Sequence, residues 1–284
     1  MTERTEATAL LPSNVASFTR NVQTNLGEKT MRTWSKFAAA VTAGCLGVTI
    51  AGTAVKAAEI ALMTTAAVEQ IMKGLIPSFE RASGHKVNMT VLGTGPAVAK
   101  IIEGTFADLI LLGPPALNEL ARAGKVDAAT ITPAFHSRIG MAVRAGAKKP
   151  DISTSDALKK ALLDAKSIGY SIGPSGEHFS KVVVVKLGIA DELRPRMKNV
   201  RGMPVGMGAA KGEVEIAIHQ IAELMPIPGI DIVGDLPAEL NTTIIYATAL
   251  TTMVQQPEAA KALVQYLRQQ SSVPVIKKNG MDPA

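Results

Sequence analysis

Three short polar turns carry the residues of this chain best suited to binding a negatively charged group. The turns contain Thr64 and Thr65, Thr94 and Gly95, and Ser175 and Gly176. Each follows an apolar or β-branched run and precedes helical spacing, so its hydroxyl and backbone N–H groups lie at the start of a helix. Helix N-termini attract anions because their first N–H groups have no partner within the helix. Each turn alone is explained equally well as a helix cap, but together they predict a site for an oxyanion or a carboxylate.

Two further side chains favour a carboxylate ligand. Arg138 begins the apolar run RIGMAV, and a guanidinium binds a planar carboxylate with two parallel hydrogen bonds. The alternative is an edge-strand arginine that pairs with solvent or with an acidic side chain. Gln220 follows the run EVEIAI and offers an amide to the same ligand. Its alternative is a strand-end residue without a role in binding.

Proton transfer, if the chain is an enzyme, has four candidate side chains near these turns: His136, His178, Glu177 and Tyr170. The histidines show no metal-ligand spacing, so no metal site is expected. His85 lies in a polar turn and is expected at the surface. No phosphate-binding loop, nucleophile elbow or complete dinucleotide fingerprint occurs in the sequence, and no cofactor is expected.

The elements that must position these residues alternate between strands and helices, the rhythm of an α/β protein. Strands are expected at 59–63, 86–92, 107–112, 138–143, 167–170, 213–218, 230–233 and 242–249. Helices are expected from 66 to 79, 97–103, 115–124, 156–165, 178–187 and 257–269. Most of the polar turns follow the carboxyl ends of strands, which is where an open parallel sheet binds its ligands.

The segment from Met31 to Ala58 has the order of a secretory signal peptide. Arg32 and Lys36 precede an uncharged stretch, and small residues surround a cleavage position near Ala57/Ala58. A retained membrane anchor and lipidation at Cys45 stay open as alternatives, as does a true start at Met31. Residues 1–58 are therefore expected to be a leader, and the protein is expected in the periplasm.

The composition excludes several classes of protein. Cys45 and the single tryptophan both lie in the leader, so a processed chain has no disulfide and no thiol chemistry. The formal net charge is +6, but basic residues are scattered and aromatic residues make up only 4% of the chain. That pattern does not fit a nucleic-acid-binding surface.

Order and residues together resemble the molybdate-binding branch of the periplasmic substrate-binding proteins of ABC transporters. The resemblance runs across residues 59–284 and rests on the segments ADLI at 107–110, ARAGKV at 121–126, AKGEVEI at 210–216, PEAAKAL at 257–263 and KNGM at 278–281. It implies an α/β fold of the type II periplasmic-binding-protein class. Each of two lobes would have a mainly parallel sheet flanked by helices, joined by two hinge strands. Lobe 1 would comprise 59–138 and 240–284, and lobe 2 would comprise 139–239.

The resemblance also implies a site and a partner. Thr64, Thr65 and Thr94 stand where that family favours serine-bearing loops, and Gln220 stands where it places a tyrosine. Arg138 departs from its neutral donors, so an organic carboxylate is expected rather than molybdate. We therefore expect a monomeric binding protein that hands a small anion to an ABC transporter permease. The alternative is an isomerase resembling aconitate isomerases, and an orphan binding protein serving a sensor is a third hypothesis.

Overall fold

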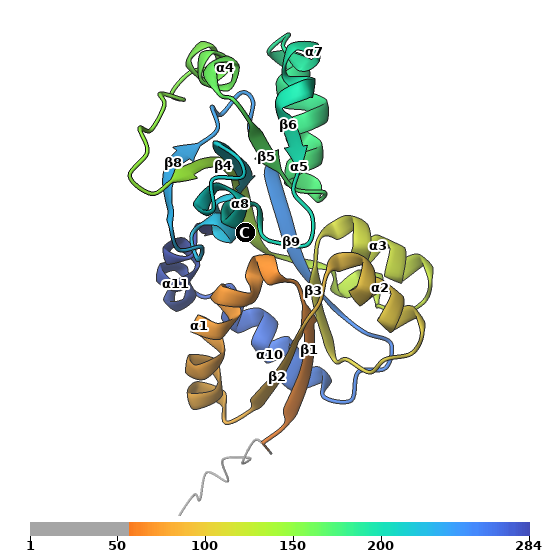
Figure 1. Ribbon diagram of the computed structural model, residues 1–284. Coiled ribbons are helices and arrows are strands. Elements are labelled where there is room, and N and C mark those ends of the chain that lie inside the picture. The colour runs from red at the N-terminus through yellow and green to blue at the C-terminus, as the bar shows by residue number, and fades with distance from the viewer. Residues whose placement is uncertain (1–56) are drawn as a thin grey trace, which may run out of the picture. The chain divides into compact units, whose positions relative to one another are not determined.

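The computed structural model describes residues 57–284 (Figure 1), so the predicted leader lies almost entirely outside the described residues. The strands are β1 (Glu59–Thr64), β2 (Lys86–Val91), β3 (Leu109–Leu112), β4 (Thr132–Arg144), β5 (Ile168–Tyr170), β6 (Met197–Asn199), β7 (Ile216–Gln220), β8 (Ile230–Asp235), β9 (Thr243–Leu250) and β10 (Met281–Pro283). The α-helices are α1 (Ala66–Ser83), α2 (Thr94–Ile102), α3 (Pro114–Arg122), α4 (Ser155–Asp164), α5 (Pro174–His178), α6 (Val184–Lys186), α7 (Ala190–Leu193), α8 (Val205–Ala210), α9 (Ile221–Leu224), α10 (Pro257–Leu267) and α11 (Val273–Lys278). Within this part of the chain, no helix is both long and apolar enough to cross a membrane.

The strands pair in the order β2-β1-β3-β9-β4-β7-β5-β6, with β8 and β10 both added to β4. The first lobe has parallel β2, β1 and β3, and β9 then pairs with β3 in the antiparallel sense. The second lobe has parallel β6, β5 and β7, and β7 pairs with β4 in the antiparallel sense. Each lobe thus combines a parallel set of three strands with antiparallel strands that lead across to the other lobe.

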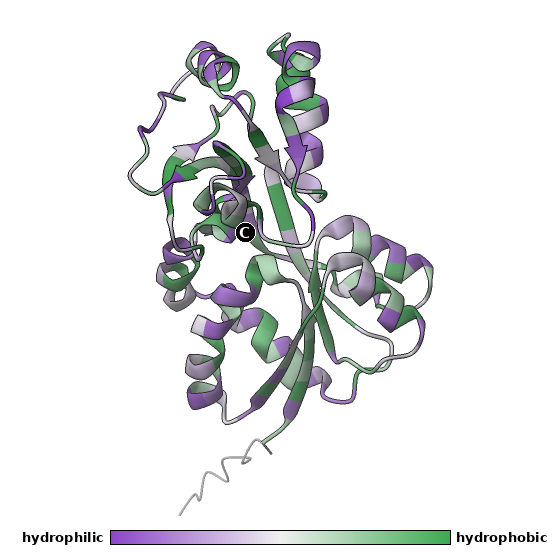
Figure 2. Ribbon diagram, viewed as in Figure 1, coloured by the Kyte–Doolittle hydropathy of each residue, from purple (hydrophilic) through white to green (hydrophobic). Residues whose placement is uncertain are grey.

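The continuous apolar run of β3 explains why helices cover both faces of the first sheet. Leu109 and Leu111 pack into the cluster with α1 and α10, whereas Ile110 and Leu112 pack into the cluster with α2 and α3. All four side chains are fully buried, as expected for a strand whose successive residues face opposite layers. Figure 2 shows hydrophobic residues along the strands and more hydrophilic residues on the flanking helices.

Strand β4 is much longer than predicted, because it begins at Thr132 and not at Arg138. Its first part pairs with β9 up to the Arg138–Thr243 pair, and its second part pairs with β7 from the Ile139–Gln220 pair onward. Sequence reasoning missed the first part because Pro133 and the polar His136 and Ser137 interrupt its apolar pattern. Tertiary pairing with β9 and β10 overrides that weak local signal.

Two other sequence expectations need correction. The helix predicted to start at His178 starts at Pro174, and it stays helical through a π-type turn (Phe179–Val183) into α6. His85, expected at the surface, is buried with 6% exposure. Its ring packs near Phe79, and its Nδ1 accepts a hydrogen bond from the Ala58 N–H at 3.2 Å.

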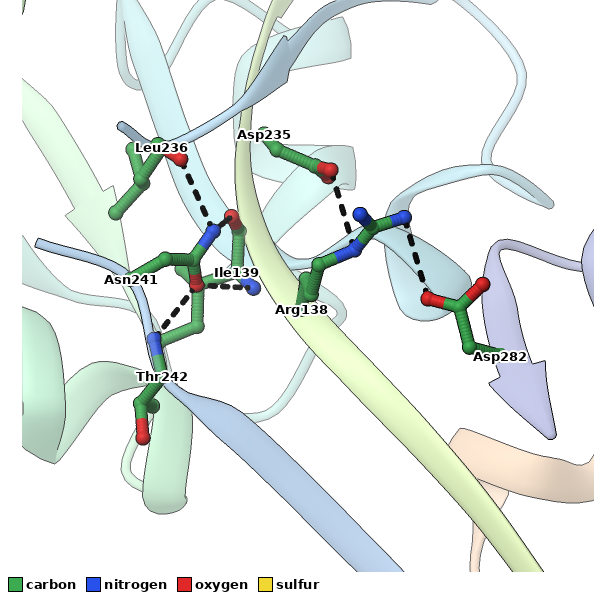
Figure 3. Close-up of polar contacts among 7 residues, drawn as sticks. All are labelled: Arg138, Ile139, Asp235, Leu236, Asn241, Thr242 and Asp282. Atoms are coloured by element: carbon green, nitrogen blue, oxygen red, sulfur yellow. Dashed lines mark hydrogen bonds and ion pairs between the residues drawn. The ribbon is translucent and has the colours of Figure 1, made fainter. Parts of the chain in front are cut away.

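Where the chain passes between the lobes, one side chain joins three segments (Figure 3). The Asn241 Oδ1 accepts from the Ile139 N–H at 3.0 Å, and its Nδ2 donates to the carbonyls of Ile139 at 2.8 Å and Leu236 at 3.1 Å. Nearby, Arg138 contacts Asp235 at 3.2 Å and Asp282 at 3.4 Å. The side chains of both ion pairs are about half-exposed, so solvent weakens the pairs and the asparagine is the stronger structural tie.

Replacing Asn241 with alanine is expected to lower the free energy of unfolding by roughly 2–4 kcal/mol, since four hydrogen bonds of about 1 kcal/mol each are lost, including one from the Thr242 N–H to Oδ1, and backbone groups are left unpaired. Urea denaturation of the purified variant measures this. Asn279→Ala is the matched control, because the Asn279 side chain bonds only to Val275 of its own helix. Equal losses in both variants would contradict a special role for Asn241.

Candidate functional site

A pocket of about 420 Å³ lies at the carboxyl ends of strands from both lobes. It is lined by Thr65, Ala66 and Ala67 after β1, Val91 to Thr94 after β2, Ser171, Gly173, Pro174 and Ser175 after β5, His219 and Gln220 of β7, Glu223 of α9, and Tyr246 of β9. This is the sheet edge at which open α/β folds bind ligands. Two larger hollows, of about 630 and 560 Å³, lie elsewhere on the surface. We take the 420 Å³ pocket as the site, because it gathers the predicted turns.

The N-termini of three helical segments border this pocket. Thr65 is the N-cap residue of α1, Gly93 that of α2, and Gly173 that of α5. None of these three residues caps its helix through a side-chain hydrogen bond. The first N–H groups of α1 and α2 are therefore available to a ligand, whereas α5 begins with Pro174, which has no N–H; the helix dipoles favour a negative charge at these ends.

The hydroxyl of Thr65 is the most informative single atom of the pocket. Thr65 is 6% exposed, and its Oγ1 is buried without a hydrogen-bond partner. A buried polar group without a partner destabilises a fold, and such groups in native structures often have a functional explanation. A ligand that accepts a hydrogen bond from Thr65 would remove this penalty.

On another wall, a chain of hydrogen bonds joins three side chains. The Tyr246 hydroxyl donates to Gln220 Oε1 at 3.0 Å, and Gln220 Nε2 donates to Glu223 Oε1 at 2.7 Å. His219 Nδ1 lies 3.5 Å from the same Glu223 oxygen and also accepts from the Gln220 backbone N–H at 2.8 Å. Gln220 is thus the central residue of a polar cluster made of His219, Gln220, Glu223 and Tyr246.

Burial shifts the titration of all three ionisable members of this cluster. It raises the pKa of Glu223 to about 7 and lowers the pKa of His219 to about 4. Burial also raises the pKa of Tyr246 well above its ordinary value, and the nearby Glu223 charge adds to that rise. At neutral pH the tyrosine and histidine are therefore neutral, and Glu223 is divided between its acid and its carboxylate.

Several of the residues predicted as ligand-binding line the pocket, and the others lie beside it. Thr65, Thr94, Ser175 and Gln220 are lining residues, whereas Thr64 donates to the Leu111 carbonyl at 2.9 Å beneath them. Gly95 adjoins Thr94 in the first turn of α2. Gly176 has a steric role, because a Cβ there would come 1.8 Å from the Ser171 carbonyl oxygen.

The structure does not bring Arg138 into the pocket. Its guanidinium is paired with Asp235 and Asp282. This agrees with the alternative interpretation of the sequence, an edge-strand arginine that pairs with acidic side chains. The four proton-transfer candidates also lie outside the lining. His178 Nε2 contacts the Leu240 carbonyl at 2.8 Å, Glu177 forms an ion pair with Lys181, and Tyr170 packs on Phe179. His136 lies opposite Asp282 in the backbone pairing of β4 with β10.

Sequence reasoning missed Glu223 and Tyr246 and gave His219 no role. Glu223 had a usable signal, because it falls in the first helical turn after the carboxyl end of a buried strand. Tyr246 had none, since it lies inside β9 and reaches the pocket only through the crossing of the lobes. Across residues 57–284, no group of three or more histidine, cysteine or acidic side chains could hold a metal ion.

Two comparisons of the sequence with known proteins identify relatives of this chain. The family model described as bacterial extracellular solute-binding protein matches residues 60–282. The chain is 31% identical over 229 residues to an aconitate isomerase from a Pseudomonas species, covering 79% of this chain and 87% of that protein.

Solved structures of low identity share the fold. The substrate-binding domain of a putative molybdenum ABC transporter from Clostridium difficile has a TM-score of 0.68 at 15% identity, covering 80% of this chain and all of that chain. The periplasmic molybdate-binding protein of Azotobacter vinelandii has a TM-score of 0.63 at 19% identity, with 78% and 98% covered. The sulfate-binding protein of Mycobacterium tuberculosis H37Rv has 0.64 at 18% identity, with 80% and 87% covered. The predicted type II periplasmic-binding-protein fold is confirmed.

Proposed function

We propose, from the premise that this chain belongs to the bacterial extracellular solute-binding protein family, that its pocket captures a small organic carboxylate. The observation that carries the proposal is the buried, unpartnered hydroxyl of Thr65 beside the open N-termini of α1 and α2. A hydroxyl donor and free N–H groups on one pocket wall suit a ligand that brings only acceptors. The aconitate isomerase relative, whose named substrate is a carboxylate, supports an organic anion over molybdate.

Delivery to an ABC transporter permease is part of this proposal. The family match and the transporter-associated structural relatives support it, as does the position of the pocket between two lobes. We propose that the lobes, divided near residues 138/139 and 239/240, close on the ligand about the crossing strands β4 and β9. A monomer in the periplasm, freed of residues 1–58, is the form in which we expect this to occur.

A second function is favoured by Glu223. An isomerase that moves a proton needs a group that both gives and takes one near neutral pH, and Glu223 lines the pocket with a pKa of about 7. The 31% identity to an aconitate isomerase supports the same function. Glu223, rather than the four residues named from the sequence, is the group we assign to proton transfer under this hypothesis.

One experiment separates the two functions. The purified protein is incubated with trans-aconitate while its melting temperature and the appearance of cis-aconitate are both followed. Stabilisation without product supports a binding protein, and product formation that is lost in Glu223→Gln supports an isomerase. If neither trans-aconitate nor other small carboxylates such as citrate stabilises the protein, while molybdate does, the carboxylate proposal is wrong.

A further inference from the structure

The binding pocket has an unusual charge composition for a site that takes an anion. Its lining, all of it within residues 57–284, includes no lysine and no arginine. The ionisable side chains in that lining are His219, Glu223 and Tyr246. His219 and Tyr246 are neutral at physiological pH, so Glu223 alone decides whether the pocket wall is neutral or negative.

The pocket-lining groups that face Glu223 come from several elements, and none of them is a cation. From β7, His219 and Gln220 contact its Oε1, and from β9, Tyr246 reaches it through Gln220. The lining contributed by α1, α2 and α5 carries hydroxyls and apolar groups but nothing that titrates in the physiological range. No neighbouring positive charge in this lining therefore offsets an ionised Glu223.

His219 offers no hydrogen bond that would stabilise an ionised Glu223. Its Nδ1 accepts the backbone N–H of Gln220, so this nitrogen carries no hydrogen and its one lone pair is already used. The Glu223 oxygen 3.5 Å away therefore receives no hydrogen bond from His219 Nδ1. The Gln220 amide can still donate to Glu223 in either protonation state.

Resting on the proposed carboxylate-binding function, we infer that Glu223 is a neutral acid in the bound state, so that the ligand is captured together with one proton. An ionised Glu223 about 4 Å from a ligand carboxylate would weaken binding by roughly a thousandfold at the effective dielectric of a protein surface. Uptake of a proton from solvent removes this repulsion. The neutral acid can then donate its O–H to the ligand, which adds a donor on the wall opposite the helix N-termini.

The coupling makes ligand capture depend on pH. Because the free pocket is only partly protonated at neutral pH, binding should take up about half a proton at pH 7 and nearly one at pH 8. Affinity should fall up to about tenfold for each pH unit above pH 8. The carboxyl groups of trans-aconitate are fully ionised in this range, so the ligand itself does not supply the proton.

Isothermal titration calorimetry with trans-aconitate in buffers of different ionisation enthalpy tests this directly. The slope of the observed enthalpy against the buffer ionisation enthalpy gives the number of protons taken up. Wild-type protein at pH 8 is expected to give a slope close to one. Glu223→Gln keeps the size and a hydrogen-bond donor, so it is expected to bind with a slope near zero and an affinity independent of pH.

Each outcome decides for or against the inference. Binding by the wild type without proton uptake overturns it, while leaving the carboxylate function intact. Uptake that persists in Glu223→Gln but disappears in His219→Asn also overturns it, since the histidine would then take the proton. If spermidine binds more tightly than trans-aconitate, with proton release, Glu223 serves as a counter-ion for a cation, and both the inference and the proposed function are wrong.

Discussion

Replacing Thr65 with valine is expected to weaken binding of a carboxylate or oxyanion by roughly 10- to 100-fold, the range for losing one hydrogen bond to a charged group. Valine has nearly the shape of threonine, so the pocket should keep its form. The free energy of unfolding should stay unchanged or rise slightly, because the substitution removes a buried hydroxyl that has no partner in the fold. Calorimetry for affinity and urea denaturation for stability measure the two effects on one preparation.

Thr64→Val is the matched control for this prediction. The neighbouring threonine is also fully buried, but its hydroxyl donates to the Leu111 carbonyl and does not line the pocket. Its replacement should therefore lower the free energy of unfolding by about 1–3 kcal/mol, because the Leu111 carbonyl is left unpaired. Under conditions in which the variant is fully folded, its affinity for the ligand should change little. The opposite pattern, in which Thr65→Val destabilises the fold without changing affinity, would remove Thr65 from the site.

Replacing Glu223 with glutamine should stabilise the unliganded protein at alkaline pH by on the order of 3 kcal/mol. The native fold raises the pKa of this carboxyl to about 7 from its ordinary value of 4.5, so the folded protein holds the proton more tightly than the unfolded chain does. The stability contributed by this proton is complete below pH 4.5 and is lost as the pH rises through 7. The wild type should therefore lose about 1–2 kcal/mol between pH 6 and pH 8, and Glu223→Gln should not.

His219 changes the pH dependence of stability in the opposite direction, so its contribution must be separated from that of Glu223. Its pKa is lowered to about 4, so its contribution is present above pH 6.5 and is lost as the pH falls towards 4. Urea denaturation between pH 6.5 and pH 9 therefore isolates Glu223. Glu119→Gln, on the exposed face of α3, controls for the loss of a negative charge as such. A wild-type stability that stays level across this range would contradict the burial of Glu223.

The parts of the fold that the sequence predicted well are those with strong local patterns. The first three strands were found nearly at their observed bounds, because each is an apolar or alternating run that ends in a polar turn. The first half of β4 was missed because its pairing with β9 joins residues more than 100 positions apart. No local pattern reports such pairing, and the Pro133 region is locally a poor strand.

The residues of the candidate site also differ in whether a local sequence pattern reveals them. The sequence predicted Thr65, Thr94 and Ser175, which line the candidate pocket, because a turn between a strand and a helix is visible in it. The placement of Arg138 could not be found in this way, since its partners Asp235 and Asp282 are far along the chain. Tyr246 reaches Glu223 only through Gln220 of another strand. Contacts of this kind exist only in the folded molecule, so they are invisible to periodicity and turn chemistry.

The pairing of β3 with β9 has a consequence for the order in which the chain folds. Leu109 pairs with Leu250, so the first sheet lacks its fourth strand until more than half of the remaining chain has been made. Pairings of such long sequence separation form slowly, because loop closure must precede the contacts that stabilise it. A fragment that stops before Thr243 can still pair β3 with β1, but it lacks β9, the neighbour on the other edge of β3. Completion of the first sheet therefore requires nearly the whole chain.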